Sequence, residues 1–198
     1  MSAGMQHGPD PGLKHRTERS LMAATLPLVI VLMGVAGCGK STMGAALSQA
    51  LGWPFRDADS FHPPANIEKM TRGISLDDAD RAPWLVAIAQ WIDARLATGE
   101  PGIVSCSALK RDYRDRIIGE RRGVRLVYLK GDKNLIAQRL QARRHHFMPA
   151  SLLASQLAVL EEPGADERPV VVSVARPPRR VVAAILQQLG LEGPAQGA

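Results

Sequence analysis

The sequence predicts an α/β fold built on a parallel sheet, and three observations support this. Short apolar runs bounded by turn residues recur five times, helical patterns lie between them, and a glycine-rich loop separates the first run from the first helix. Strands that alternate with helices are typical of a parallel sheet covered by helices. With 198 residues, 45% of them apolar, the chain can bury a core within one domain.

The five apolar runs have the length and composition of buried parallel strands. They are LVIVLM (28–33), WPFRD (53–57), GIVSCS (102–107), VRLVYL (124–129) and VVVSV (170–174). The first run follows basic residues, an order also found in secretion signals and membrane anchors. Pro27 and nearby glycines interrupt it, which favours a strand. We expect one domain over 27–190, with flexible tails at 1–26 and 191–198.

Helical patterns fill the intervals between the strands. The first helix follows the glycine-rich loop, carries Met43 and Leu47 on one face and ends at Gly52. The next is expected to begin at Pro83, a favourable first-turn residue, and to end at Gly99. Further helices are expected after the capping residue Asp132, from Pro149, and over 181–189.

Charge and cysteine content narrow the classes of partner. The formal charge of +6 favours anions, whereas only 4% of residues are aromatic and no basic run is interleaved with stacking side chains. Small anions are therefore favoured over nucleic acid, and no membrane partner is expected. Cys38 and Cys106 form no CxxC or His/Cys cluster, so the sequence predicts neither a disulfide framework nor a zinc site and fits a reducing cytoplasm.

The segment GVAGCGKS (34–41) matches the phosphate-loop pattern GxxxxGK[ST] between a strand and a helix. Lys40 is expected to reach the β- and γ-phosphates of ATP, Ser41 to bind Mg²⁺, and Thr42 to contact the α-phosphate. Cys38 is interpreted as a small loop residue rather than a redox thiol. The nucleotide-binding residues are then Gly34, Val35, Ala36, Gly37, Cys38, Gly39, Lys40, Ser41 and Thr42.

An acid pair follows the second strand, in DADSFHPPANIEKM (57–70). Asp57 and Asp59 are expected at the carboxyl edge of the sheet, on the same side as each other and facing the phosphate loop. One acid could hold a water of the metal ion while the other accepts the proton of an attacking hydroxyl. A solvated pair of loop acids is the alternative.

Taken together, the motifs resemble those of the P-loop gluconokinases, which are similar to shikimate kinases. The resemblance spans about residues 28–189 and is carried by DADSFHPPANIEKM, GISLDDADRAPWL (73–85), CSALKRDYRD (106–115), VYLKG (127–131), HFMPASLLASQ (146–156) and LEEPGADE (160–167). It implies transfer of the γ-phosphoryl group of ATP to the C6 hydroxyl of D-gluconate.

The resemblance also implies a fold and roles for the acids. The fold is the three-layer nucleoside-monophosphate-kinase type of P-loop NTPase, with strand order 2-3-1-4-5, a substrate-binding insertion at about 58–100 and a lid at about 139–156. Asp57 would act through the magnesium shell and Asp59 would face the sugar hydroxyl. A cytoplasmic homodimer is implied too.

Gluconate carries a carboxylate and a row of hydroxyls, so its site should offer cations and hydrogen-bonding side chains. Arg81 and Lys110 are the main candidates, and surface ion pairs are the alternative for both. The remaining candidates are Asp59, His62, Arg114, His146 and Gln156, with a structural role equally open for His62. Trp84, Trp91 and Met70 are expected in the core.

The segment RLQARRHHF (139–147) is expected in the lid. Arg139 and Arg143 lie four residues apart on a predicted helix, so they would share a face and neutralise charge on the transferred phosphoryl group. A solvated basic face is the alternative. His145 stands where the family usually has glycine, which could change the lid geometry.

Two other functions stay open from the sequence. One is a kinase for another small acceptor, such as shikimate or a different sugar acid, although SCSALK replaces the glycine cluster that shikimate kinases have after the third strand. The other is a nucleotide-dependent switch or a nucleic-acid-associated ATPase. Such proteins have no use for an acceptor pocket containing the acid pair, Arg81 and Lys110.

Overall fold

The structure is a computed structural model that describes residues 29–142 and 150–192. Its five strands form one sheet in the order β2-β3-β1-β4-β5, and every pairing is parallel. The strands are β1 (Val29–Met33), β2 (Phe55–Asp57), β3 (Gly102–Ser105), β4 (Val124–Lys130) and β5 (Val170–Ser173). The predicted strand order is confirmed.

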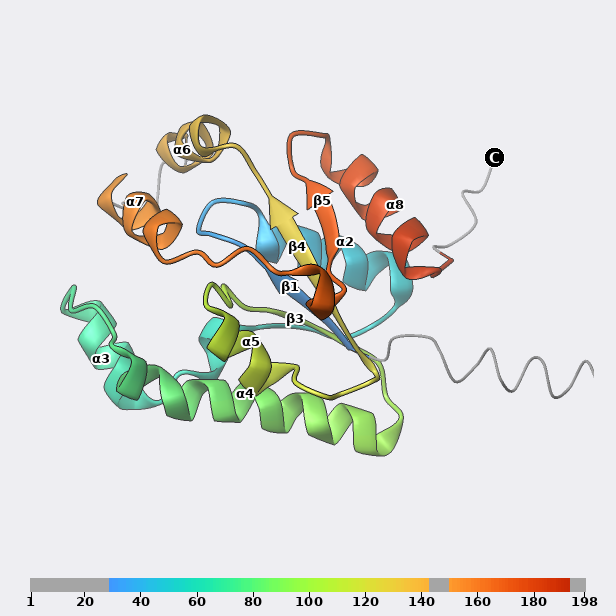
Figure 1. Cartoon of the computed structure of the whole chain (residues 1–198), viewed down its shortest axis with the longest axis horizontal. Helices are drawn as coiled ribbons and strands as arrows, with labels where there is room; N and C mark the ends of the chain where they lie inside the picture. The colour runs from blue at the N-terminus through green and yellow to red at the C-terminus, as the bar shows by residue number, and fades with distance from the viewer. Residues whose placement is uncertain (1–28, 143–149, 193–198) are drawn as a thin grey trace, which may run out of the picture.

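Helices cover both faces of this sheet (Figure 1). One face packs against α2 (Lys40–Leu51) and α8 (Pro178–Leu189), and the other against α4 (Asp78–Thr98) and α5 (Arg111–Ile117). The remaining elements are α3 (Pro64–Thr71), α6 (Lys133–Gln141), α7 (Ala150–Ala158) and two 3₁₀ helices, η1 (Ala58–Phe61) and η2 (Ala165–Glu167). The architecture is a three-layer sandwich.

The central strand β1 contributes to both hydrophobic cores. Ile30 and Leu32 pack on the side of α2 and α8, whereas Val29, Val31 and Met33 pack on the side of α4 and α5. All five side chains are fully buried. A parallel strand that is covered on both faces has this continuous apolar sequence, so the interpretation of LVIVLM as a strand is confirmed from Val29 onward.

Helix α4 begins five residues earlier than predicted, at Asp78 rather than Pro83. A capping box explains the difference: the Asp77 carboxylate accepts a hydrogen bond from the Asp80 backbone N–H at 2.8 Å, and Asp80 accepts one from the Asp77 N–H at 3.1 Å. Pro83 then lies inside the helix, where its missing N–H removes one backbone bond. The cap therefore determines the start of the helix.

Other expectations have mixed outcomes. Asp132 caps α6 by accepting from the backbone of Asn134 and Leu135, as predicted. Trp84 is buried and Trp91 packs at the core margin, but Met70 is 43% exposed on α3, so its assignment to the core is wrong. The predicted N-terminal tail, residues 193–198 and the predicted helix start at Pro149 lie outside the described residues, whereas Leu191, assigned to the C-terminal tail, packs against the core. Within the described part of the chain, no helix is long and apolar enough to cross a bilayer.

Candidate active site

The phosphate loop joins the carboxyl end of β1 to the first turn of α2. Gly37 and Gly39 have φ values of +83° and +98°, which side chains other than glycine rarely adopt. Gly39 occupies the N-cap position of α2 and has no side chain with which to cap it. The first N–H groups of this helix and its positive dipole end are therefore available to an anion.

Lys40 folds back over the loop from which it extends. Its ammonium donates hydrogen bonds to the carbonyl oxygens of Gly34 at 2.8 Å and Val35 at 3.2 Å. The loop is also bound to the segment that follows β3, where the Ser107 carbonyl accepts a hydrogen bond from the Gly34 N–H at 3.3 Å. These bonds hold the loop around the region where phosphate oxygens would lie.

Ser41 and Asp57 meet at the edge of the sheet. The Ser41 hydroxyl donates to Asp57 Oδ2 at 2.7 Å, while Asp57 Oδ1 accepts from the Asp59 N–H at 3.2 Å. Two hard oxygen groups thus lie side by side next to the loop, which suits an ion that keeps most of its waters and takes one carboxylate and a phosphate. No group of three or more His, Cys, Asp or Glu residues in the described chain forms a separate metal site.

Asp59 lies two residues after Asp57, on η1, and its side chain is exposed. Burial raises the pKa of the Cys106 thiol to about 12, and the charges of Lys40, Asp59 and Asp57 all act on that thiol. All three charged groups therefore lie within electrostatic range of the end of β3. Asp57 contacts Ser41 of the helix that follows the phosphate loop, and Asp59 is bound to Asp57 through its backbone N–H.

His62 lies between the acid pair and α4. Its ring stacks on Trp84 with centroids 4.6 Å apart, and Nδ1 lies 3.3 Å from the Asn66 amide nitrogen. Burial lowers the pKa of His62; the Asp59 charge opposes this effect, and the Arg81 charge adds to it. The imidazole is thus held neutral at pH 7, in reach of both Asp59 and Arg81.

Four side chains gather beyond His62 and form what we call the Asp78 cluster: Asp78, Arg81, Lys110 and Tyr113. The Lys110 ammonium donates to both Asp78 oxygens, at 3.0 and 2.7 Å, and the Tyr113 hydroxyl donates to Asp78 Oδ1. Arg81 Nη1 lies 3.6 Å from the same oxygen. Both predicted acceptor cations therefore share one carboxylate.

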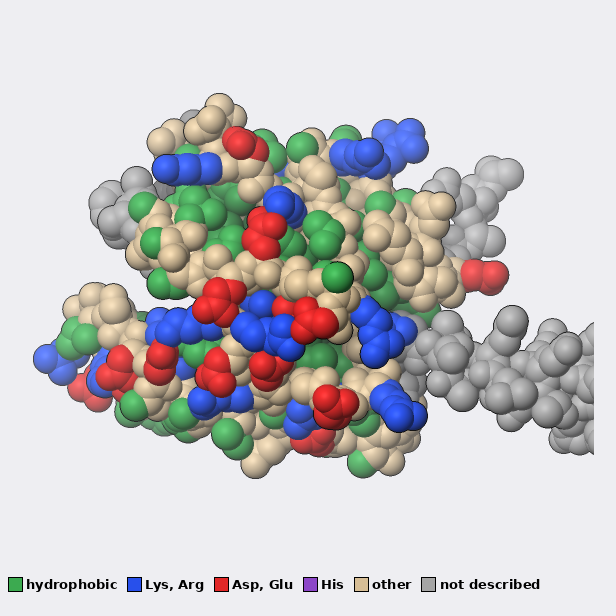
Figure 2. All heavy atoms as spheres, in the orientation of Figure 1, with side chains coloured by type: hydrophobic (Ala, Val, Ile, Leu, Met, Phe, Trp, Pro, Cys, Tyr) green, Lys and Arg blue, Asp and Glu red, His purple; other side chains and the backbone are tan. Residues whose placement is uncertain are grey.

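Arg114 is the candidate whose position argues against its predicted role. Its side chain is 2% exposed, forms a bidentate pair with Glu167 and also donates to the Ala108, Leu109 and Glu161 carbonyl oxygens. All of this hydrogen bonding lies inside the fold, so Arg114 joins α5 to the segment after α7 and is not placed to bind substrate. Figure 2 shows a band of basic and acidic side chains across this face of the molecule. On the same helix as Arg114, Arg111 pairs with Asp115 and also with Asp166.

Gln156 also lies elsewhere than expected. From α7 its Oε1 accepts a hydrogen bond from the Ala36 backbone N–H at 2.6 Å, so the side chain contacts the phosphate loop rather than the acceptor side. The two lid helices lie near this loop, and the Leu140 side chain of α6 packs against Gly37. Arg143, His145 and His146 lie outside the described residues.

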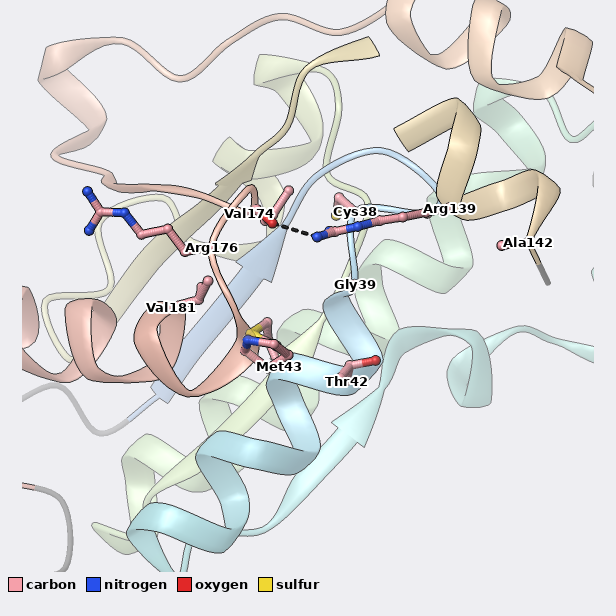
Figure 3. A pocket seen from close by; sticks show the side chains of 11 residues that line it. Cys38, Gly39, Thr42, Met43, Arg139, Ala142, Val174, Arg176 and Val181 are labelled. Carbon is pink, nitrogen blue, oxygen red and sulfur yellow. Dashed lines mark hydrogen bonds between the residues drawn. The ribbon is translucent and has the colours of Figure 1, made fainter. Parts of the chain in front are cut away.

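A cavity of about 330 Å³ opens beside the phosphate loop, and Arg139 forms part of its wall (Figure 3). Arg139 Nη2 donates to the Val174 carbonyl at 2.7 Å, close to Cys38 and Thr42. The lining also includes Arg176 and Pro178, which the sequence reasoning missed along with Val174. Their position after the last strand could have identified them, because parallel sheets bind ligands at this edge.

Comparisons with known proteins identify relatives of this chain. A family model described as an AAA domain matches residues 29–163. The chain is 43% identical over 176 residues to a gluconokinase of Gluconobacter oxydans, covering 89% of this chain and 99% of that protein. It is 42% identical over 160 residues to the thermoresistant gluconokinase of Escherichia coli, covering 80% and 91%. A crystal structure of a gluconokinase from Sinorhizobium meliloti aligns with TM-score 0.74 at 48% identity, covering 83% and 93%.

Proposed function

The chain belongs to the gluconokinase family, and from that premise we propose that it transfers the γ-phosphoryl group of ATP to the C6 hydroxyl of D-gluconate, giving 6-phospho-D-gluconate and ADP. The observation that carries this proposal is the hydrogen-bonded link from the phosphate loop to the acid pair, in which Asp57 accepts from the Ser41 hydroxyl and from the Asp59 N–H. Arg81 and Lys110 form a second group of polar side chains around Asp78.

The donor side would bind ATP through the backbone of residues 34–42 and the Lys40 ammonium. Lys40 would exchange its carbonyl partners for the β- and γ-phosphate oxygens, which accept stronger, charge-assisted bonds. The base and ribose would enter the cavity lined by Arg139, Val174 and Arg176. The role predicted for Arg139, neutralising charge on the transferred phosphoryl group, would require its guanidinium to exchange the Val174 carbonyl for phosphate oxygens.

Mg²⁺ is the ion that this site fits best. Ser41 Oγ would ligate it directly, and Asp57 would hold one of its waters. When bound, the ion would screen the charge on the phosphates and align the γ-phosphoryl group for in-line attack. The hydrogen bond from the Asp59 N–H already fixes the orientation of the Asp57 carboxylate. Ser41 and Asp57 would therefore need little rearrangement to hold the ion.

On the acceptor side, Asp59 would take the proton of the C6 hydroxyl as that oxygen attacks the γ-phosphorus. Arg81 and Lys110 would bind the carboxylate at the other end of the acceptor, and His62 would contact the hydroxyls between. Because His62 is held neutral, its ring can exchange hydrogen bonds with hydroxyl groups without adding charge.

The proposal extends to the lid and to the whole enzyme. Residues 58–100 would form the acceptor-binding insertion of a single domain over 27–190. Residues 139–156 would close over the reactants, with Arg143 and His146 reaching the phosphoryl group and the acceptor and Gln156 linking the lid to the loop. A cytoplasmic homodimer that does not use nucleic acid completes the proposal, and light scattering tests its oligomeric state.

A coupled assay of ADP release tests the function. With magnesium-ATP, the acceptors are D-gluconate, other aldonates, shikimate, free sugars and nucleoside monophosphates, with DNA and RNA in separate reactions. Strong turnover with gluconate, and none with shikimate or nucleic acid, is the expected result. Stimulation of ADP release by nucleic acid alone would indicate an ATPase module instead of a kinase. Turnover with a different acceptor alone would indicate a kinase for that acceptor.

A further inference from the structure

Three acidic residues at the start of α4 have different tasks. Asp77 and Asp80 form the capping box, and Asp80 also pairs with Lys69 at 2.6 Å. Asp78 belongs to neither arrangement: its carboxylate contacts Lys110 and Tyr113, which follow β3 in the chain. Asp77 and Asp80 cap the helix without Asp78. Helix capping therefore does not explain why Asp78 contacts Lys110 and Tyr113.

We propose that Asp78 is a positioning residue that fixes the cations Lys110 and Arg81 and thereby makes the acceptor site selective for a carboxylate. The inference rests on the proposed function and deepens it, because it assigns the selectivity for an acid over a neutral sugar to a residue that does not itself touch the acceptor. The arrangement of donors, the balance of charge and the location of the cluster support it.

The donors of Lys110 are held in a defined direction. A lysine ammonium sits on a flexible four-carbon stem and has three N–H donors. Two of them go to the two Asp78 oxygens, and the Tyr113 ring lies with its centroid 5.4 Å from Nζ. These bonds restrict the ammonium, so part of the loss of side-chain freedom has occurred before the acceptor arrives.

The charge of the cluster suits one further carboxylate. Arg81 and Lys110 contribute two positive charges and Asp78 one negative charge, so the cluster has a net charge of +1. Hydrogen bonds to Lys110 and Tyr113 lower the pKa of Asp78, so this residue stays ionised at neutral pH. A monoanionic acceptor matches this charge, whereas a neutral sugar leaves it unmatched.

The Asp78 cluster is connected to the proposed reaction centre through His62 and through α4. Arg81 and Asp59 both act electrostatically on His62, which places Arg81 on the acceptor side of the acid pair. The Trp84 indole of α4 donates to the Ala58 carbonyl of η1 at 2.7 Å, so the start of α4 is fixed to the segment that carries Asp59. An acceptor that binds at Arg81 and Lys110 can therefore extend toward Asp59.

Steady-state kinetics of Asp78→Asn test the proposal. We expect the KM for gluconate to rise about tenfold or more, with kcat and the KM for ATP within about twofold of wild type, because the charge-assisted bonds that orient Lys110 and Arg81 for the acceptor are lost. Selectivity for gluconate over a neutral sugar, measured as the ratio of kcat/KM values, should fall. Lys110→Met and the double variant should differ in KM by much less than Asp78→Asn differs from wild type, because Asp78 acts mainly through Lys110.

Asp112→Asn is the matched control. Asp112 is also an exposed first-turn acid with an arginine partner, Arg116 at 2.9 Å, but it lies in α5 outside the cluster. It should keep the wild-type KM for gluconate. An unchanged gluconate KM in Asp78→Asn, or additive effects of Asp78→Asn and Lys110→Met, would overturn the positioning role while the function stands. A wild-type enzyme that ignores gluconate would instead overturn the function.

Discussion

The donor and acceptor sides of this site are built in different ways. The donor side is one continuous segment whose shape depends on backbone conformation, with Gly37 and Gly39 in the left-handed region. The acceptor side is assembled from side chains of η1, α4 and α5, and ion pairs around Asp78 hold it. A site made of backbone is specified by residue spacing, whereas a site made of side chains depends on how distant segments pack.

The donor and acceptor sides should therefore respond differently to amino-acid substitutions. Substitutions in the phosphate loop should affect every reaction of the enzyme, because all of them need the nucleotide. Substitutions on the acceptor side should change which acceptor is used, or how fast, and leave nucleotide binding intact. The following variants test that separation, from the largest expected effect to the smallest.

Lys40→Ala should have the largest effect. Removal of the ammonium takes away charge stabilisation of the β- and γ-phosphates and should lower kcat/KM by roughly 10³-fold with any acceptor. Lys133→Ala, at the exposed start of α6, is the control and should behave like wild type. Turnover above about a tenth of wild type in Lys40→Ala would show that the loop does not bind the phosphates as proposed.

Asp59→Asn should separate binding from chemistry. The amide cannot accept the hydroxyl proton, so kcat should fall roughly 10²- to 10⁴-fold while the dissociation constant of ATP, measured by calorimetry, stays near wild type. Asp57→Asn should instead raise the Mg²⁺ concentration needed for half-maximal rate. Wild-type turnover in Asp59→Asn would exclude this residue as the proton acceptor.

Arg114→Met tests the structural role that the structure gives this residue. The variant removes the bidentate partner of the nearly buried Glu167 and leaves it with the Gly164 N–H and Arg111 at 3.7 Å, so the free energy of unfolding should fall by about 3 kcal/mol. The exposed Arg116→Met is the control and should change it by less than about 0.5 kcal/mol. Chemical denaturation at pH 7 measures both, and an equal change in the two variants would contradict the assignment.

The same pair has a defined pH dependence. Burial by itself would raise the pKa of Glu167, but hydrogen bonds from Arg114 and the Gly164 N–H outweigh it and lower that pKa below its ordinary 4.5. A carboxylate whose pKa is lowered on folding stabilises the protein above its unfolded pKa and loses this effect as the pH falls through the folded value. The stability difference between wild type and Arg114→Met should therefore narrow below about pH 4.5.

Gly37→Ala tests how far the donor side depends on backbone shape. A Cβ at this position would lie 2.7 Å from Leu140 Cγ, and φ is +83°. Strain and overpacking should lower the free energy of unfolding by roughly 1–3 kcal/mol and weaken ATP binding as well. Gly73→Ala shares the positive φ, but nothing crowds a Cβ there. This control should lose less stability and keep its affinity for ATP.

Ser105→Ala should have the smallest effect. The Ser105 hydroxyl is buried at the end of β3, beside Asp57 in the sheet register, and has no hydrogen-bond partner among the described residues. Removing an unpaired buried hydroxyl should change the free energy of unfolding by less than about 1 kcal/mol, in either direction. A loss of several kcal/mol, or a large fall in kcat, would show that this hydroxyl has a partner in the working enzyme.

The fold and the donor side were largely predictable because each depends on local rules. Apolar runs, glycine stops and the phosphate-loop spacing identify the strands, most helices and residues 34–42. The start of α4 was mispredicted because Pro83 resembled a first-turn residue and the Asp77–Asp80 box was overlooked. The two acids three residues apart, Asp77 and Asp80, are the sequence signal for the true start of α4.

On the acceptor side, residue type alone gave incomplete answers. Three cations lie near the same motifs in the sequence: Arg81, Arg114 and Lys110. In the structure Arg114 forms a buried pair with Glu167, whereas Arg81 and Lys110 pair with Asp78. Gln156 likewise contacts the Ala36 N–H of the loop. The partners of Lys110, Arg114 and Gln156 lie 32, 53 and 120 positions away, whereas Arg81 meets Asp78 within one helical turn.

The sequence by itself determined the parallel sheet, the phosphate loop and the acid pair, because periodicity, glycine spacing and i, i+2 geometry act over short stretches of chain. Only the tertiary structure decided that Arg114 supports the fold while Lys110 and Arg81 meet Asp78, that the Ala36 N–H binds Gln156, and that the loop after β5 lines the cavity beside the phosphate loop. These contacts arise where separate βα units meet at the sheet edge, and their geometry follows from packing rather than from local sequence.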